Sequence, residues 1–390
     1  MWYQRDFSNF IDKIEALPIK ILKGPRQVGK TSLLQRRSDY HTVYLDDASV
    51  RTRAEENPRL LLDNLPDKLI LDECPLAPAL FPELKRRVDE QRRNRDSHPL
   101  PDYWITGSNQ TLLQRNVRET LAGRASYFDL STLSIHELGQ DWSLADYLLK
   151  GGWPELYVSP KLSPARYLND LISTFIENDI VNAAGIERKA AFTKFLQLAA
   201  GRVGQLCNYS DIASVAGVDV TTIQSWSLIL EENGIIRRIL PYWSNTNKRL
   251  TKTPKLYFED VGLATRLQGW TSVEPLLASP ACGNLIENIA LGEIVRFFLN
   301  RGQTPEINFI RSKEKVEVDF IVHLPNQLAI AVEVKTTPQN DFTKQQIDLL
   351  ASTNINFVEH WIVAPNKSPN FQIAQVLSFE EIAQGLSKYF

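Results

Sequence analysis

Cysteine is scarce in this chain, and several features that would narrow its class are missing. The 390 residues include three cysteines, Cys74, Cys207 and Cys282. They are far apart and odd in number, which argues against a disulfide framework and against a cysteine-based zinc site. No apolar run is long enough to span a bilayer, and the first residues contain no signal-peptide hydrophobic region. We therefore expect a cytoplasmic protein without a membrane partner.

An excess of charge of one sign is missing too. The formal net charge is −2, which argues neither for nor against nucleic acid, because a local basic face can hide in a balanced total. The apolar fraction of 43% and the charged fraction of 23% are those of a globular protein. At 390 residues, the chain exceeds one ordinary core and predicts two to four domains.

The most informative stretch is residues 24–31, which read GPRQVGKT between an apolar strand at 18–23 and an amphipathic run at 32–35. The spacing G-x-x-x-x-G-K-T is that of a phosphate-binding loop. Glycines allow backbone N–H groups to point at phosphate oxygens, while the lysine reaches phosphates and the threonine hydroxyl ligates Mg²⁺. A chance turn is disfavoured by the flanking strand and helix. The sequence predicts ATP and Mg²⁺ as cofactors, bound by Gly24, Pro25, Arg26, Gln27, Val28, Gly29, Lys30, Thr31 and Ser32.

Two adjacent carboxylates follow the next apolar strand, at residues 68–71. Asp72 is predicted to hold Mg²⁺ opposite Thr31, and Glu73 to activate the water that attacks the γ-phosphate. Alone, such a pair could equally cap the following turn. The upstream loop favours the catalytic interpretation.

Two further catalytic candidates lie beside other strands. The strand at 103–107 leads into Ser108 and Asn109, which we expect near the γ-phosphate because ligands sit beyond the carboxyl ends of parallel strands. A helix cap is the alternative. Arg124 precedes the strand at 125–130 and is predicted to act as an arginine finger for a neighbouring subunit, which implies a homo-oligomer. A surface ion pair is the competing interpretation.

These motifs together carry a family resemblance. Residues 7–138 resemble the AAA-type ATPase domain of a widespread prokaryotic family through GPRQVGKT, a strand ending in Asp-Glu, TGS at 106–108 and LAGR at 121–124. The resemblance implies a parallel sheet with helices on both faces. It extends over nearly the whole chain, where the family's C-terminal half has no assigned function, through GGWPE, YFEDVGL, EVDF and VEVK, which begin at residues 151, 257, 317 and 332.

The middle of the chain reads as helical and then as a helix-turn-helix with a wing, over residues 208–258. As a DNA reader, it would present four polar side chains to a major groove and four basic ones to phosphates. A structural or protein-binding winged helix is slightly favoured, because the recognition face carries no Arg or Lys. The groove-facing candidates are Thr221, Thr222, Gln224 and Ser225, and the phosphate-binding candidates are Lys248, Arg249, Lys252 and Lys255.

The C-terminal third predicts the element order αβββαβ, which matches the core of the restriction-endonuclease-like fold. Alternation along the second and third strands places Asp319, Glu333 and Lys335 on one face. In this D…E-x-K pattern the carboxylates bind Mg²⁺ and the lysine steadies the attacking hydroxide or the scissile phosphate. Glu287, on the preceding apolar helix, would complete the metal shell. The alternative is an inactive domain in which Lys335 pairs with Asp319 or Glu333.

The sequence therefore predicts the α/β class, with a P-loop AAA-type parallel sheet at residues 1–138 and a helical connector at 139–186. A winged helix at 187–262 and a restriction-endonuclease-like domain at 263–390 follow. The predicted function is Mg²⁺-dependent ATP hydrolysis, with a C-terminal half that binds nucleic acid, DNA rather than RNA, and cleavage as a further hypothesis. The rival is a nucleotide-dependent scaffold that catalyses little.

Overall fold

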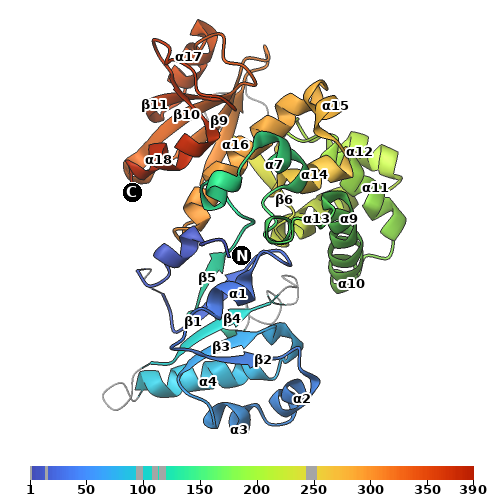
Figure 1. Cartoon of the computed structure of the whole chain (residues 1–390), viewed down its shortest axis with the longest axis vertical. Coiled ribbons are helices and arrows are strands. Elements are labelled where there is room, and N and C mark those ends of the chain that lie inside the picture. Colours follow the sequence, from blue (N-terminus) through green and yellow to red (C-terminus); the bar gives the residue numbers. More distant parts are fainter. Residues whose placement is uncertain (1, 14–15, 94–99, 108–112, 114–119, 243–252) are drawn as a thin grey trace.

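Alternating apolar residues build the N-terminal third around a five-stranded parallel sheet of order β2-β3-β4-β1-β5. The computed structural model describes residues 2–13, 16–93, 100–107, 113, 120–242 and 253–390. Figure 1 shows this sheet below, with the green helices and the orange-to-red C-terminal sheet above it. Its elements are η1 (Asp6–Asn9), β1 (Ile19–Lys23), α1 (Lys30–Leu34), β2 (His41–Tyr44), α2 (Ala48–Glu56), α3 (Pro58–Asp63), β3 (Lys68–Asp72), η2 (Cys74–Leu76), α4 (Leu80–Arg93), β4 (Asp102–Thr106), β5 (Ala125–Asp129), α6 (Ile135–Leu138) and η3 (Gly139–Asp141).

Successive side chains of a strand point to opposite faces of the sheet, so each strand contributes apolar side chains to both faces. Ile19 and Ile21 of β1 pack in a cluster with α2, α3 and α4, whereas Leu22 packs in the cluster that contains Leu33 and Leu34 of α1. β3 and β4 divide their side chains in the same way. The predicted parallel sheet with helices on both faces is confirmed, and its carboxyl ends all lie at one edge.

The middle of the chain is helical and ends in an antiparallel hairpin. α7 (Leu144–Lys150) ends before Gly151, where an added Cβ would lie 1.8 Å from Oδ1 of Asp260, so only glycine fits there. The elements are α7 (Leu144–Lys150), α8 (Glu155–Val158), α9 (Pro164–Leu171), η4 (Ile172–Ile180), α10 (Val181–Ala183), α11 (Lys189–Ala200), α12 (Tyr209–Ala216), α13 (Val220–Glu232), β6 (Ile236–Pro241), β7 (Lys255–Phe258), α14 (Val261–Leu267) and α15 (Val273–Leu277).

The C-terminal third has the predicted element order and a mixed sheet. Its elements are α16 (Ala281–Leu299), β8 (Ile307–Arg311), β9 (Glu317–His323), η5 (Pro325–Gln327), β10 (Leu328–Val334), α17 (Lys344–Ala351), β11 (Asn356–Val363), β12 (Gln375–Leu377), η6 (Phe379–Glu381) and α18 (Ile382–Ser387). α16 is buried on nearly every side, which explains why its sequence is apolar without a clear polar face.

The hairpin of the middle region belongs to this C-terminal sheet. The seven strands run in the order β12-β11-β10-β9-β8-β6-β7, because β6 pairs in parallel with β8 at Leu240↔Asn308 and Pro241↔Phe309. The predicted boundary between residues 262 and 263 falls within α14, and strands on both sides of it belong to this one sheet. Within the described residues, no helix combines the length and apolar character needed to cross a membrane.

Candidate functional site

The loop between β1 and α1 adopts a conformation that depends on its glycines. Gly24 has φ +144°, and a Cβ there would lie 2.1 Å from the carbonyl oxygen of Leu130. Gly29 has φ +92°, and α1 begins at the next residue, Lys30. Gln27 also has positive φ, 62°, which is uncommon for a residue with a side chain. The backbone thus curls back on itself, as a phosphate-binding loop requires.

Lys30 is held inside this loop. Its Nζ donates to the carbonyl oxygens of Gly24 and Pro25, both at 2.8 Å, and the residue is 6% exposed. Burial lowers the pKa of Lys30 to about 8, against the opposing effect of Glu73 and Asp72. A phosphate would offer the ammonium charged acceptors in place of neutral carbonyls.

The predicted metal ligands lie together at the carboxyl ends of the strands. Thr31 Oγ1 donates to Asp72 Oδ1 at 2.7 Å, and Thr106 Oγ1 donates to the same oxygen at 2.5 Å. A hydroxyl beside a carboxylate is an oxygen donor set that suits Mg²⁺. The residues present therefore fit the implied metal. Thr106 was not among the predicted site residues, although it belongs to the TGS motif.

The backbone at Glu73, the residue after β3, departs from the extended conformation of the strand. Glu73 has φ +54°, and its N–H donates to Thr106 Oγ1 at 3.3 Å. Its side chain borders the same cavity as Lys30 and Thr31. An uncommon backbone conformation at a polar strand end is typical of catalytic positions.

The cavity beside the loop has a volume of about 710 Å³. One wall is residues 26–32 with Glu73, and a second comes from the N-terminal segment through Trp2, Tyr3 and Arg5. The third comes from the middle region, which contributes Pro154, Glu155, Val158, Leu171 and Thr174. Three distant parts of the sequence therefore enclose the predicted nucleotide site.

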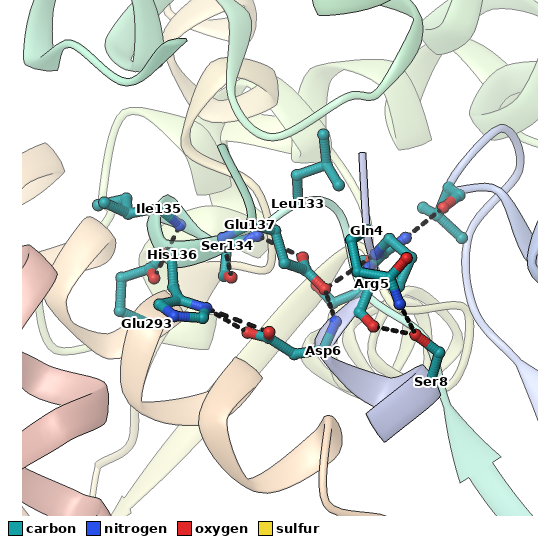
Figure 2. Close-up of polar contacts among 12 residues, drawn as sticks. Gln4, Arg5, Asp6, Ser8, Leu133, Ser134, Ile135, His136, Glu137 and Glu293 are labelled. Carbon is teal, nitrogen blue, oxygen red and sulfur yellow. Dashed lines mark hydrogen bonds and ion pairs between the residues drawn. The ribbon is translucent and has the colours of Figure 1, made fainter. Parts of the chain in front are cut away.

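Arg5 connects the loop to the end of the N-terminal third, and Figure 2 shows its contact with Glu137. It is 3% exposed, and it donates to the carbonyl oxygens of Val28 at 2.7 Å and Ser131 at 2.8 Å. Its Nε donates to Glu137 Oε1 at 3.0 Å. Glu137 also accepts from the backbone N–H groups of Asp6 and Ser134, each at 2.8 Å. Sequence reasoning missed Arg5, because no motif marks it.

The polar contacts continue from this point into the C-terminal helix α16. The N–H of Ile135 donates to Glu293 Oε2 at 3.0 Å (Figure 2). Arg296 pairs with Glu293 at 3.1 Å and donates to the Glu259 carbonyl at 2.9 Å. Burial raises the pKa of Glu293 to about 7, although Arg296 opposes the shift.

The remaining predicted residues of the ATPase site divide into two cases. Ser108 and Asn109 lie outside the described residues. Arg124 pairs with Asp89 of α4 through two contacts, Nε–Oδ1 at 2.7 Å and Nη2–Oδ2 at 2.9 Å. Its carbonyl accepts from Ile19 N–H at 3.2 Å, so it sits at the amino end of β1, opposite the edge that carries the loop.

The D…E-x-K residues do come together. The N–H of Val334 donates to Asp319 Oδ2 at 2.8 Å, and Lys335 Nζ donates to Glu333 Oε2 at 2.6 Å. Burial, reinforced by Asp319, raises the pKa of Glu333 to about 8 and that of Glu287 to about 7. Among the described residues, no group of three or more His, Cys, Asp or Glu side chains is arranged to hold a metal ion.

Lys255 occupies a different place from the one predicted. It is 2% exposed, and its ammonium contacts Glu287 Oε1 at 2.9 Å and Glu317 Oε1 at 2.5 Å. The prediction that Lys255 contacts phosphates is wrong, because its side chain is buried against the carboxylates of Glu287 and Glu317. Lys248, Arg249 and Lys252 lie outside the described residues.

The predicted recognition helix α13 presents a mixed surface. Thr221, Gln224 and Ser225 are exposed and Thr222 is half-buried. Beside them, Val220 is 37% exposed and Leu228 is 48% exposed. Exposed apolar side chains among neutral polar ones suit a protein partner as well as a DNA groove.

Comparison with known proteins assigns the N-terminal third to a class. Residues 17–139 match the family model of an AAA domain, in agreement with the loop, the sheet and the strand-end carboxylate. The N-terminal third is therefore an AAA-type ATPase-like domain. Residues 141–274 and 282–381 match two models described only as domains of unknown function, DUF8612 and DUF4143.

Three other proteins are similar to this chain over much of its length. An uncharacterized protein of Mycobacterium tuberculosis is 28% identical over 324 residues, which are 82% of this chain and 70% of that protein. One from Haemophilus influenzae is 22% identical over 356 residues, which are 83% and 84% of the two chains. The Walker-type ATPase PABY2304 of Pyrococcus abyssi is 14% identical at a TM-score of 0.38, covering 67% of this chain and 93% of its own. At that score the likeness is loose, and no residue correspondence follows from it.

Proposed function

We propose that this chain binds ATP with Mg²⁺ on the loop at residues 24–31 and hydrolyses it. The observation that carries the proposal is that Lys30, Thr31 and Glu73 line one cavity, while Asp72 accepts a hydrogen bond from Thr31 beside it. The loop offers backbone N–H groups and an ammonium to phosphates, while the strand ends offer a metal ligand and a base. Lys30 and Thr31 begin α1, whereas Asp72 and Glu73 stand at the end of β3, so their meeting is a property of the fold.

Thr31 and Asp72 would hold the metal, which when bound neutralises charge on the phosphate oxygens. Lys30 exchanges the carbonyls of Gly24 and Pro25 for β- and γ-phosphate oxygens. Glu73 accepts a proton from the attacking water, whose oxygen bonds to the γ-phosphorus. The bond from that phosphorus to the bridging oxygen breaks, and ADP leaves with that oxygen. The Glu73 carboxylate then returns the proton to solvent.

Steady-state ATP turnover of the wild type and of Glu73→Gln tests the proposal. We expect Glu73→Gln to bind ATP with wild-type affinity and to lose turnover by roughly 100-fold or more, since a positioned base contributes about that much. Glu56→Gln, on the exposed side of α2, is the matched control and retains turnover. If the wild type binds ATP but turns over no faster than Glu73→Gln, the nucleotide-dependent scaffold is the correct function.

For the C-terminal half, the second candidate function is contact with nucleic acid through α13. The exposed side chains of Thr221, Gln224 and Ser225 support it, and the burial of Lys255 counts against it. Stimulation of ATP turnover by DNA or RNA would support this function and couple it to the ATPase site. Plasmid nicking with Mg²⁺ or Mn²⁺ tests cleavage, and equal nicking by wild type and Asp319→Ala would refute it.

A further inference from the structure

Four carboxylates gather beneath the β6–β7 hairpin on three elements of the C-terminal third. Glu287 comes from α16, Glu317 and Asp319 from β9, and Glu333 from β10. All four are buried or half-buried, and Oε1 of Glu333 is a buried oxygen without a hydrogen-bond partner among the described residues. Buried carboxylates in such number need cations beside them.

The central cation is part of the chain itself. Nζ of Lys255 lies 2.9 Å from Glu287 Oε1, 2.5 Å from Glu317 Oε1 and 3.8 Å from Asp319 Oδ1. The ammonium therefore stands among three of the oxygens that a divalent ion would need. A metal ion placed there would meet both the steric bulk and the positive charge of Lys255.

Other side chains complete the neutralisation of this cluster. Arg311 Nη1 lies 2.5 Å from Glu317 Oε2, and Lys335 Nζ lies 2.6 Å from Glu333 Oε2. The Tyr257 hydroxyl donates to Glu287. Three cationic side chains thus face four carboxylates. At most one further positive charge would be needed to neutralise the cluster.

The backbone on both sides of Lys255 fixes its position. Lys255 pairs with Ile239 of β6 and forms a bridge with Leu206, and its side chain is 3% exposed. The strand pairing therefore fixes the backbone of Lys255, and the surrounding protein covers its side chain in the cluster.

We infer that Lys255 is the resident cation of this acidic cluster and that the C-terminal sheet, as it stands, takes no divalent metal. The expected Mg²⁺ site of a D…E-x-K nuclease does not fit these residues. The cluster instead fastens β7 to α16 and β9, so the hairpin behind the helix-turn-helix is bound to the C-terminal sheet by charge as well as by strand pairing. This inference is independent of ATP hydrolysis.

Equilibrium binding of Mn²⁺ to the nucleotide-free, full-length protein tests the inference. All variants carry Thr31→Ala. This change removes the hydroxyl that would bind Mn²⁺ at the loop, so that the loop does not add to the number of Mn²⁺ ions bound per chain. We expect the parent and its Asp319→Asn derivative to bind Mn²⁺ equally. Lys255→Ala should gain one site per chain, and Lys255→Ala with Asp319→Asn should lose it again. Lys335→Ala is the matched control, since it removes an equal charge from a 46% exposed side chain and should gain no site.

Two results would overturn the inference. One is a Mn²⁺ site in the parent that Asp319→Asn abolishes, which would mean that the metal and Lys255 coexist. The other is a Lys255→Ala protein with the parent's circular dichroism that binds no more Mn²⁺ than the parent. The comparison of the parent with Asp319→Asn leaves Lys255 unchanged. If Lys255→Ala does not fold, this comparison alone tests whether the cluster binds a divalent metal.

Discussion

Replacing Arg5 with methionine keeps most of the side chain's apolar volume and removes its guanidinium. The change leaves the buried Glu137 without its cation, and it leaves the carbonyls of Val28 and Ser131 without this donor. Breaking a buried ion pair by removing one partner costs about 3–5 kcal/mol, because the remaining charge is uncompensated. We expect Arg5→Met to lower the free energy of unfolding by about that much. ATP affinity should fall too, since the Val28 carbonyl belongs to the phosphate loop.

Urea denaturation followed by tryptophan fluorescence measures the loss, and equilibrium titration with ATP measures the affinity. Arg53→Met makes the same chemical change on the exposed face of α2 and should cost less than about 1 kcal/mol, as surface substitutions usually do. Adding Glu137→Gln to Arg5→Met should recover part of the loss, because it removes the unpaired charge. An Arg5→Met protein as stable as Arg53→Met would refute the reasoning.

Two further predictions concern pH and assembly. Burial raises the pKa of Glu293 from 4.5 to about 7, so the native state binds its proton more tightly than the unfolded chain between those pH values. Stability should fall as pH rises through that window, and Glu293→Gln should remove up to about 3 kcal/mol of this decline in urea denaturation at pH 5 and pH 8; an unchanged slope would contradict it. Arg124→Ala should cost at most about 1 kcal/mol, because its pair with Asp89 is partly exposed. If Arg124 acts on a neighbouring subunit, the variant should lose turnover by about 1,000-fold and restore partial activity when mixed with Lys30→Ala. A strictly monomeric protein with ATP would count against that action.

The parts of the fold that depend on local patterns could be predicted from the sequence. Motif spacing placed Lys30 and Thr31 beside one another, since strand, loop and helix follow in order, and the parallel sheet brings the end of β3 with Asp72 to the same edge. Alternation placed Asp319 and Glu333 on one face of the C-terminal sheet. These signals work because the residues concerned are close in sequence or share a regular periodicity. The chemical roles of these residues stay predictions until turnover and metal binding are measured.

Contacts between distant segments could not be predicted in this way. Arg5 meets Glu137 across 132 residues, and nothing near either residue marks the pairing. Lys255 was misplaced for a related reason: as a wing residue it reads as exposed, but β6 also pairs with β8. That additional pairing covers β7's side chains with α16 and β9. Lys255 is therefore buried and forms internal ion pairs in place of the predicted contact with phosphates.

The loop at residues 24–31 contacts the end of the helix-turn-helix directly. A Cβ at Gly234, which follows α13, would lie 3.2 Å from Cδ of Pro25 in the loop, so the helix end packs tightly against the loop. A cavity of about 200 Å³ lies between them and is bordered by Arg237 and Glu259, which pair at 2.7 Å. Because packed interiors resist compression, displacement of Pro25 on one side of this contact must displace α13 or fill that cavity. The loop and the helix-turn-helix therefore meet at Pro25 and Gly234. β6 begins two residues after Gly234 and pairs with β7 and β8, so this contact adjoins the C-terminal sheet.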